Sequence, residues 1–271
     1  MRTSIRLVGL AAAAVLGLAA CSEAPVTGRD RITPVSQDRL AQEADQIYRE
    51  ELSRHRLSND DVQTAMVRRV GQRIAAAAEN PPEGKWRAPR FDWQFALIEE
   101  PQTVNAFCLP GGKIAVYSGI LPVAGDETGL GIIVGHEVAH ALLNHHGERA
   151  SQQMAVGAIS GIGGAILGSM IAGRDNRAAG ALIGAGAGLA GGLVLMSFGR
   201  DQESEADRVG LILAAAAGYD PRAAIGVWER MRAANTGGRP PEFLSTHPSE
   251  ETRIANIRRH LPEAMQYYRP R

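Results

Sequence analysis

The chain has 271 residues, of which 29 are Lys or Arg and 29 are Asp or Glu, so its formal net charge is zero. This length is enough for one large domain or two small ones with a well-buried core. The balanced charge excludes the strongly basic surface expected of a nucleic-acid-binding protein or of a protein held electrostatically on anionic membranes.

The N-terminus has the features of a bacterial export signal. Two arginines precede a short apolar run that ends at Ala20, so residues 1–20 are predicted to be a signal peptide. The run ends in 18-LAAC-21, which resembles a lipobox and predicts that Cys21 is lipidated and becomes the first residue. Acyl chains would then attach the protein to a membrane. By similarity to such lipoproteins, Ser22 implies an outer-membrane location facing the periplasm.

Residues 21–36 are predicted to be a lipidated tether, because they are rich in Pro, Gly, Thr and Arg and lack periodicity. The remaining residues, 37–271, are expected to form one domain. Apolar residues at helical spacing predict helices over 36–52 and 58–79. The second helix would have Ser58 as its N-cap and would stop before two prolines.

The middle of the chain carries the predicted strands. Alternation of apolar and polar residues predicts a strand within 91–100, and 104–121 is typical of two short strands around the turn 110-PGG-112. With Cys21 assigned to lipidation, Cys108 has no partner for an intrachain disulfide. We expect it to be a small buried apolar residue and not a catalytic thiol.

The second half of the chain is predicted to be helical. Residues 154–198 are rich in Gly and Ala and are divided by 174-RDNR-177 into two apolar halves, which predicts a hairpin of closely packed helices. This hairpin either inserts into a membrane or covers the cleft, and we favour the cover. Helical patterns are expected over four segments: Glu127 to His146, Arg200 to Gly218, Pro221 to Ala234, and a last helix from near Ser249.

The segment 135-GHEVAHALLNHHGER-149 contains the pattern H-E-x-x-H. Residues four apart lie on one helical face, so His136 and His140 can present imidazole nitrogens to one zinc ion. Glu137 stands beside them and is expected to act as a general base toward water. The flanking residues are strongly apolar, so these polar groups would be buried. Burying polar groups destabilises a protein, which indicates that they have a function.

Two residues compete to be the third ligand. His146 has the spacing used by metzincins, but Leu143 stands where that pattern has a helix-breaking Gly, and a continuing helix would turn His146 away. Alternatively, Glu203 in 203-ESEAD-207 completes a His₂Glu site, and Asp207 accepts a hydrogen bond from a ligand histidine. A solvated acidic helix face has the same spacing, so spacing alone leaves these alternatives open.

Four segments together resemble metallopeptidase family forty-eight, a gluzincin group with HtpX-, BepA- and LoiP-like members, and in particular its periplasmic lipoprotein branch. They are 104-VNAFCLPGGKIAVYSGIL-121, 135-GHEVAH-140, 203-ESEAD-207 and 246-THPSEETRI-254. The resemblance covers about residues 40–260. It implies an α+β, mainly helical zincin (gluzincin) fold with a small sheet, a Gly-rich helical hairpin insertion and one Zn²⁺ per chain.

The resemblance also implies roles for individual residues. His136, His140 and Glu203 would be the zinc ligands, Asp207 would hold a ligand histidine, and a substrate backbone would bind along Asn105, Ala106 and Phe107 by strand addition. His145 matches a histidine common after the motif, to which we assign no chemistry. His247 is expected either to stabilise the oxyanion or to bind the zinc and close the site, with Arg253 as a second candidate for the oxyanion.

The predicted function is a zinc-dependent endopeptidase of the bacterial envelope that degrades unfolded or misassembled envelope proteins. The substrate class comes from the resemblance and not from the residues. The alternative is a non-enzymatic lipoprotein that binds or chaperones proteins on a zincin scaffold. Glu137 argues against pure binding, because a scaffold has no need of a general base. Membrane contact is expected through the lipid anchor and, if the hairpin inserts, through residues 154–198; nucleic acid is not an expected partner.

Overall fold

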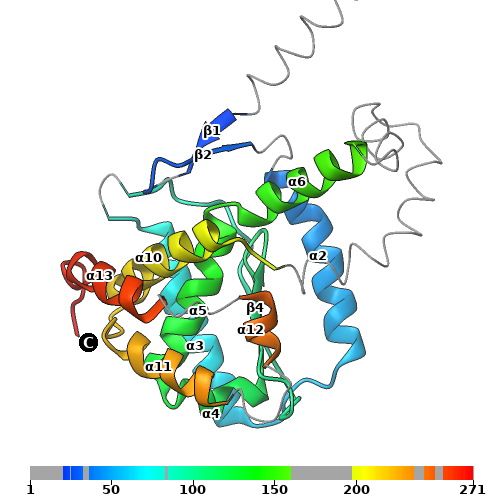
Figure 1. Ribbon diagram of the computed structural model, residues 1–271. Helices are drawn as coiled ribbons and strands as arrows, with labels where there is room; N and C mark the ends of the chain where they lie inside the picture. Colours follow the sequence, from blue (N-terminus) through cyan, green and yellow to red (C-terminus); the bar gives the residue numbers. More distant parts are fainter. Residues whose placement is uncertain are drawn as a thin grey trace, which may run out of the picture.

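A computed structural model of the protein describes residues 21–24, 26–32, 37–82, 85–159, 197–234, 241–247 and 253–270. Figure 1 shows helices packed around a small sheet, with the C-terminus at the edge of the helical layer. This agrees with the predicted mainly helical α+β class. The predicted signal peptide and nearly all of the predicted Gly-rich hairpin lie outside the described residues. In the ranges given above, no helix combines the length and the apolar character needed to cross a bilayer.

Three strands form a mixed sheet in the order β3-β5-β4. Strand β3 (Gln94–Ile98) runs parallel to β5 (Lys113–Tyr117), and β4 (Ala106–Leu109) runs antiparallel to it. The predicted turn between β4 and β5 contains Gly111 and Gly112, whose φ angles are +83° and +85°. Glycine is needed there because a side chain disfavours this left-handed region. The order leaves β4 at the edge of the sheet.

Alternate strand residues pack against helices on the two faces of the sheet. On one face, residues such as Leu97 and Val116 join a core with α3 (Asp61–Glu79) and α5 (Glu127–Leu142). On the other face, residues such as Ala115 pack against α2 (Gln37–Arg54). Figure 1 shows α2 on the outer side of the sheet, opposite α3 and α5. The sheet is therefore covered on both faces, which explains why β4 and β5 are buried throughout.

Predicted helices are present with shifted boundaries. The structure also has helices at 118–120, 121–124, 145–159 and 242–246 that were not predicted. Helix α3 begins after Asp60, whose side chain caps Gln63 N at 2.9 Å, and not after the predicted N-cap Ser58. The other elements are η1 (Ser118–Ile120), α4 (Leu121–Ala124), α6 (His145–Ile159), α10 (Arg200–Ala216), α11 (Ala223–Ala233), α12 (Glu242–Thr246) and α13 (Arg253–Met265).

Helices α5 and α10 cross in backbone contact. A Cβ added at Gly210 of α10 would lie 2.8 Å from Cα of His136, and one added at Gly135 would lie 2.9 Å from O of Gly210. Such distances are below ordinary carbon contact, so only glycine allows the crossing. The close approach brings the acidic face of α10 to the histidines of α5.

The N-terminal segment predicted to be a tether differs from that prediction in the structure. Strand β1 (Cys21–Glu23) pairs antiparallel with β2 (Asp30–Ile32), and the pair contacts α6. We call residues 21–24 and 26–32 the N-terminal hairpin. Arg31 donates a hydrogen bond to the carbonyl of Leu143 at the end of α5, so the hairpin docks on the domain. The lipidation of Cys21 stays a prediction.

Candidate metal centre

Four buried side chains meet where α5, α10 and the end of α12 converge. His136 and His140 come from α5, Glu203 from α10, and His247 directly follows α12. One ligand atom from each lies within 4.8 Å of all the others. The four residues are at most 5% exposed. The structure thus brings the two histidines of the motif together with the distant carboxylate that spacing alone had left undecided.

The distances between these atoms suit a tetrahedral ion. Two ligands each about 2.0–2.1 Å from zinc stand about 3.3 Å apart in a tetrahedral site. Nε2 of His136 lies 3.1 Å from Nε2 of His140, 3.5 Å from Oε2 of Glu203 and 3.3 Å from Nδ1 of His247. Nε2 of His140 and Nδ1 of His247 lie 3.5 Å and 3.0 Å from Oε1 of Glu203.

The chemistry of the donor set also fits zinc. Burial holds the pKa of His140 well below its usual value, so the ring is neutral and offers a lone pair. Glu203 is buried, with Oε1 facing His140 and His247 and Oε2 facing His136. Imidazole nitrogens with one carboxylate are ligands that zinc prefers. His136, His140 and Glu203 could therefore hold the ion, with His247 within reach of the fourth position.

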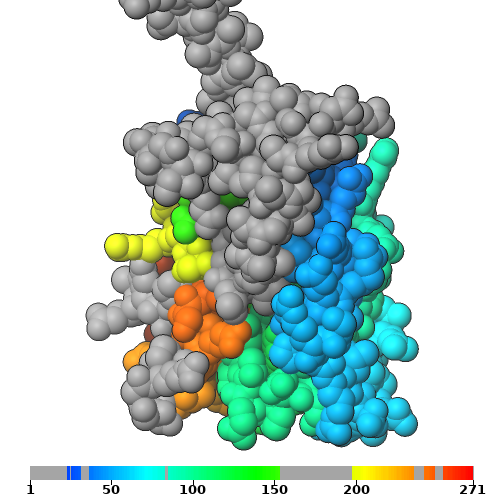
Figure 2. All heavy atoms as spheres, turned by 90° about the vertical axis from the view of Figure 1, so that its right-hand side faces the viewer, coloured from blue at the N-terminus to red at the C-terminus, as the bar shows by residue number. Residues whose placement is uncertain are grey.

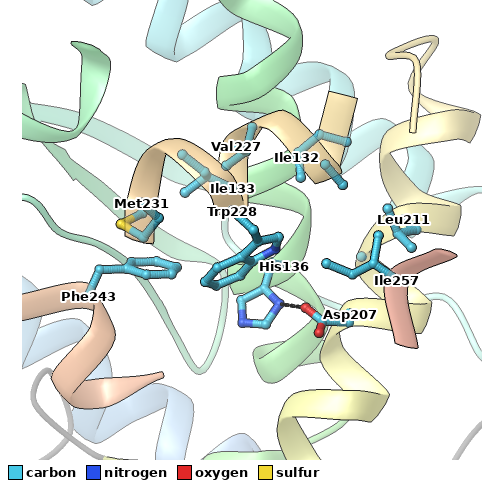
Figure 3. A pocket seen from close by; sticks show the side chains of 12 residues that line it. Ile132, Ile133, His136, Asp207, Leu211, Val227, Trp228, Met231, Phe243 and Ile257 are labelled. Atoms are coloured by element: carbon cyan, nitrogen blue, oxygen red, sulfur yellow. Dashed lines mark ion pairs between the residues drawn. The ribbon is translucent and has the colours of Figure 1, made fainter. Parts of the chain in front are cut away.

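A second carboxylate orients His136. Oδ1 of Asp207 lies 3.0 Å from Nδ1 of His136, the contact drawn as a dashed line in Figure 3. Arg253 donates from Nη2 to the same oxygen at 2.8 Å, and its Nη1 lies 2.9 Å from Oε2 of Glu203. Its guanidinium also lies 3.5 Å from the ring centroid of Trp228. Arg253, predicted as a weak oxyanion candidate, is thus engaged with two carboxylates of the site.

Glu137 has the properties of a proton acceptor. It is 3% exposed, and burial raises its pKa to about 7 although His247 opposes the shift. Its Oε1 has no hydrogen-bond partner within the described ranges and lies 3.4 Å from Nε2 of His247. A carboxyl group with a pKa near neutrality can take up a proton and return it.

The short helix α12 ties His247 to the edge of the sheet. The backbone N–H of Phe243 donates to O of Val104 at 3.1 Å, and Nδ2 of Asn105 donates to Glu242 at 2.9 Å. Figure 2 shows this face of the molecule, with α12 in orange on the left of the green surface and α2 in blue on its right. Asn105, Ala106 and Phe107 are all buried, at 1%, 1% and 5% exposure. The predicted substrate-binding edge therefore begins beneath the helix that leads into His247.

His146 stays outside the group of possible ligands, although the predicted reason was wrong. The helix was expected to continue to His146, but α5 ends at Leu142, Asn144 adopts a φ of +56°, and α6 begins at His145. Asparagine tolerates this left-handed conformation better than most residues, which explains the break. His146 instead packs edge-on against Phe198, with ring centroids 5.2 Å apart, and burial lowers its pKa to about 3.

Cys108 is a core residue, as expected. It is 1% exposed in β4, and burial raises the pKa of its thiol well above the usual value. A thiol that stays protonated is a poor nucleophile. This geometry gives no support to a metal-independent hydrolase based on Cys108.

An apolar pocket adjoins His136. Figure 3 shows Trp228, Met231 and Phe243 around one side of it, with Ile132 and Ile133 of α5 nearby. Helix α11 supplies two of these residues, and nothing in its amphipathic pattern distinguished them from ordinary core. Only the packing of α11 against α5 reveals them as neighbours of the metal centre.

Comparison with known proteins gives consistent matches. Residues 61–261 match Peptidase family M48. The chain is 36% identical over 244 residues to mitochondrial metalloendopeptidase OMA1 of Schizosaccharomyces pombe, covering 89% of the chain and 66% of the relative. It is 30% identical to human OMA1 and 30% identical to the beta-barrel assembly-enhancing protease of Escherichia coli, covering 46% and 39% of those proteins. The chain thus spans about two fifths to two thirds of these relatives.

These relatives correct the predicted location. The chain was expected to be an outer-membrane lipoprotein facing the periplasm. Six matching relatives, from yeasts, animals and a plant, are mitochondrial metalloendopeptidases, which is evidence against that location. The prediction of the location was wrong because it was based on the first 22 residues alone. The match to the mitochondrial enzymes comes from most of the chain.

The family match covers the H-E-x-x-H motif, Glu203 and His247, the residues that the structure gathers into one possible metal site. This confirms the resemblance seen in the sequence. The chain therefore belongs to Peptidase family M48, a family of zinc-dependent metalloendopeptidases.

Proposed function

We propose that this chain hydrolyses internal peptide bonds of unfolded or misassembled proteins, using zinc held by His136, His140 and Glu203. The observation that carries the proposal is the buried carboxyl of Glu137, one oxygen of which accepts no hydrogen bond from the described residues and lies beside the possible ligands. A site that only bound metal would not require a proton acceptor there. Zinc, when bound, would supply Lewis acidity toward the substrate carbonyl and toward water.

The chain's own residues divide the remaining work. Glu137 takes a proton from the attacking water and later delivers it to the leaving amine. Asp207 accepts the Nδ1 proton of His136 and so keeps Nε2 directed at the ligand set. Arg253 balances the negative charge of Asp207 and Glu203, because it contacts both carboxylates. These contacts hold the polar groups of α5 and α10 in one geometry before substrate binds.

Substrate is proposed to bind as an added strand along Asn105, Ala106 and Phe107, at the edge of the sheet formed by β4. In the present conformation α12 occupies the start of this edge, since Phe243 already donates to the carbonyl of Val104. Displacing α12 would free the edge and would also withdraw His247 from the metal centre. We therefore favour a closing role for His247 over stabilisation of the oxyanion.

The substrate class follows from the binding mode and from the relatives. Strand addition needs an extended backbone with free N–H and C=O groups, which folded proteins seldom expose. One relative is named for enhancing β-barrel assembly, which favours membrane-envelope proteins that have failed to assemble. The same mode would serve any unfolded segment, so this extension rests on the name of the relative alone.

Cleavage of an unfolded protein such as casein tests the proposal. The Glu137→Gln variant should retain wild-type zinc content but lose activity by about 10²–10⁴-fold, because it cannot accept a proton. Equal cleavage by the two proteins would refute the peptidase assignment. The His247→Ala variant separates its two roles: a closing residue predicts faster cleavage, whereas an oxyanion donor predicts slower cleavage.

A further inference from the structure

A second buried polar cluster adjoins the metal centre next to His140. It contains His145 at the start of α6, Glu205 of α10, Glu148 of α6, and Thr27 and Arg29 of the N-terminal hairpin. His145 is 0% exposed and the two glutamates are 5% exposed. The mechanism proposed above uses none of these residues. Arg29 and Thr27 also lie outside the span 61–261 that matches the family.

The contacts form a continuous chain from a possible zinc ligand to the hairpin. Nδ1 of His140 lies 2.9 Å from Nδ1 of His145, and Nε2 of His145 lies 3.1 Å from Oε2 of Glu205. Arg29 donates from Nη2 to that same carboxylate oxygen at 2.8 Å. The hydroxyl of Thr27 donates to the other oxygen of Glu205. Every link is a direct contact between side chains.

If His140 binds the metal, the direction of every hydrogen bond in this series is fixed. Nε2 of His140 faces the ligand set, so it must offer its lone pair there, and the ring proton is on Nδ1. Nδ1 of His140 therefore donates to Nδ1 of His145, which leaves the proton of His145 on Nε2. That nitrogen in turn donates to Glu205. A carboxylate at the end is the acceptor that this arrangement requires.

Arg29 stabilises the buried carboxylate of Glu205. The carboxylate of Glu205 accepts hydrogen bonds from His145, Arg29 and Thr27, and these contacts offset the cost of burying its charge. Arg29 also contacts Glu148 through two hydrogen bonds of 2.8 and 2.7 Å. A buried charge without such a partner is strongly unfavourable. Removing the guanidinium would leave two adjacent carboxylates without this shared counterion.

The geometry points to Arg29 as a positioning residue of the metal centre: through Glu205 and His145 it fixes the orientation of His140. The arrangement parallels the opposite side of the site, where Arg253 and Asp207 orient His136. Each ligand histidine is thus backed by a carboxylate and an arginine, and the second set extends into the N-terminal hairpin. The inference rests on the proposed zinc ligation by His140, and it does not require peptidase activity.

Zinc affinity of the full chain, measured by competition with a chromophoric chelator, tests this inference. Loss of a group that orients a ligand typically weakens metal binding about 10–100-fold, and we expect Arg29→Gln to fall in that range. Arg29→Lys, which keeps the charge without the fork of donors, should lie between wild type and Arg29→Gln. Circular dichroism of each variant verifies that the protein measured is folded.

Two further variants distinguish positioning from general docking of the hairpin. Arg31→Gln is the comparison variant, because Arg31 docks the same hairpin through its hydrogen bond to the carbonyl of Leu143. Its charge also acts on Glu148 and Glu205, so its zinc affinity should fall, but clearly less than that of Arg29→Gln. Adding Glu205→Gln to Arg29→Gln should weaken binding little beyond the larger single effect, since both act on one path.

Three results would overturn the inference: unchanged affinity in Arg29→Gln, equal losses in Arg29→Gln and Arg31→Gln, or fully multiplicative losses in the double variant. Because zinc binding needs no cleavage, these results are independent of whether the protein proves to be a peptidase. Wild-type protein that binds no zinc would overturn both this inference and the proposed function, and would be recognised before any variant is compared.

Discussion

The contact between α5 and α10 makes Gly210→Ala an informative change. The new Cβ would lie 2.8 Å from Cα and 2.9 Å from N of His136. Carbon atoms in ordinary contact stay about 3.5–4.0 Å apart, so the helices would have to separate by roughly 0.7 Å or more. The atoms it meets belong to the backbone and cannot rotate away. Overpacking of this kind costs about 1–3 kcal/mol of folding free energy.

The displacement would act directly on the metal centre. Glu203 and Asp207 lie on the same helix as Gly210, seven and three residues before it, so separating α10 from α5 draws both away from His136. Metal sites tolerate departures of only about 0.2 Å in ligand distance. We therefore expect Gly210→Ala to lower the Tm of the metal-free protein and to weaken zinc binding by about tenfold or more.

Thermal unfolding of the metal-free protein and chelator competition measure the two effects. The matched control is Gly226→Ala in α11, where the added Cβ would meet only the end of the Arg230 side chain, at 3.2 Å. The guanidinium is held by bonds to the carbonyls of Val123 and Ala124, but it needs to shift by only a few tenths of an ångström. Alanine favours a helix over glycine by about 0.8–1.0 kcal/mol, which offsets this shift, so the control should be about as stable as wild type. A Gly210→Ala protein with wild-type Tm and zinc affinity would refute the reasoning.

Three further outcomes are expected. Hydrogen bonds from Arg208, the largest cause, and from Lys85 lower the pKa of Glu263 to about 2 from its usual 4.5. The ionised Glu263 therefore stabilises the fold above about pH 4.5, and this stabilisation is lost as the pH falls through 2. Glu263→Gln should cost about 1–2 kcal/mol in denaturant titrations at neutral pH, allowing for solvent screening, and progressively less as the pH falls to 2 and below. Asp60→Ala, which removes the N-cap of α3, should cost about 1 kcal/mol by the same assay. Chelation should lower the Tm of wild type but hardly that of Glu203→Gln, because only the former binds zinc tightly; equal shifts would count against Glu203 as a ligand.

Local patterns were sufficient for the elements that carry the site. Helical spacing predicted α5 and α10, and the PGG turn predicted β4 and β5, because these patterns reflect burial of one face and the backbone needs of glycine. The spacing of His136 and His140 already placed both on one side of a helix. The ends of elements were less predictable. The helix that carries the motif was predicted to continue to His146, but it ends at Leu142, because Asn144 adopts a left-handed conformation that the periodicity does not indicate.

The sequence by itself determined the H-E-x-x-H motif and the family, and it predicted Glu137 as the general base, since these depend on residues close together on one helix or on a shared pattern. Only the tertiary structure decided which distant groups join them. Glu203 reaches the histidines because Gly135 and Gly210 let two helices touch, and His247 arrives on α12, which is held by the edge of the sheet. Arg29 lies more than a hundred residues before His145, and no local pattern can indicate a contact that exists only when the chain packs on itself.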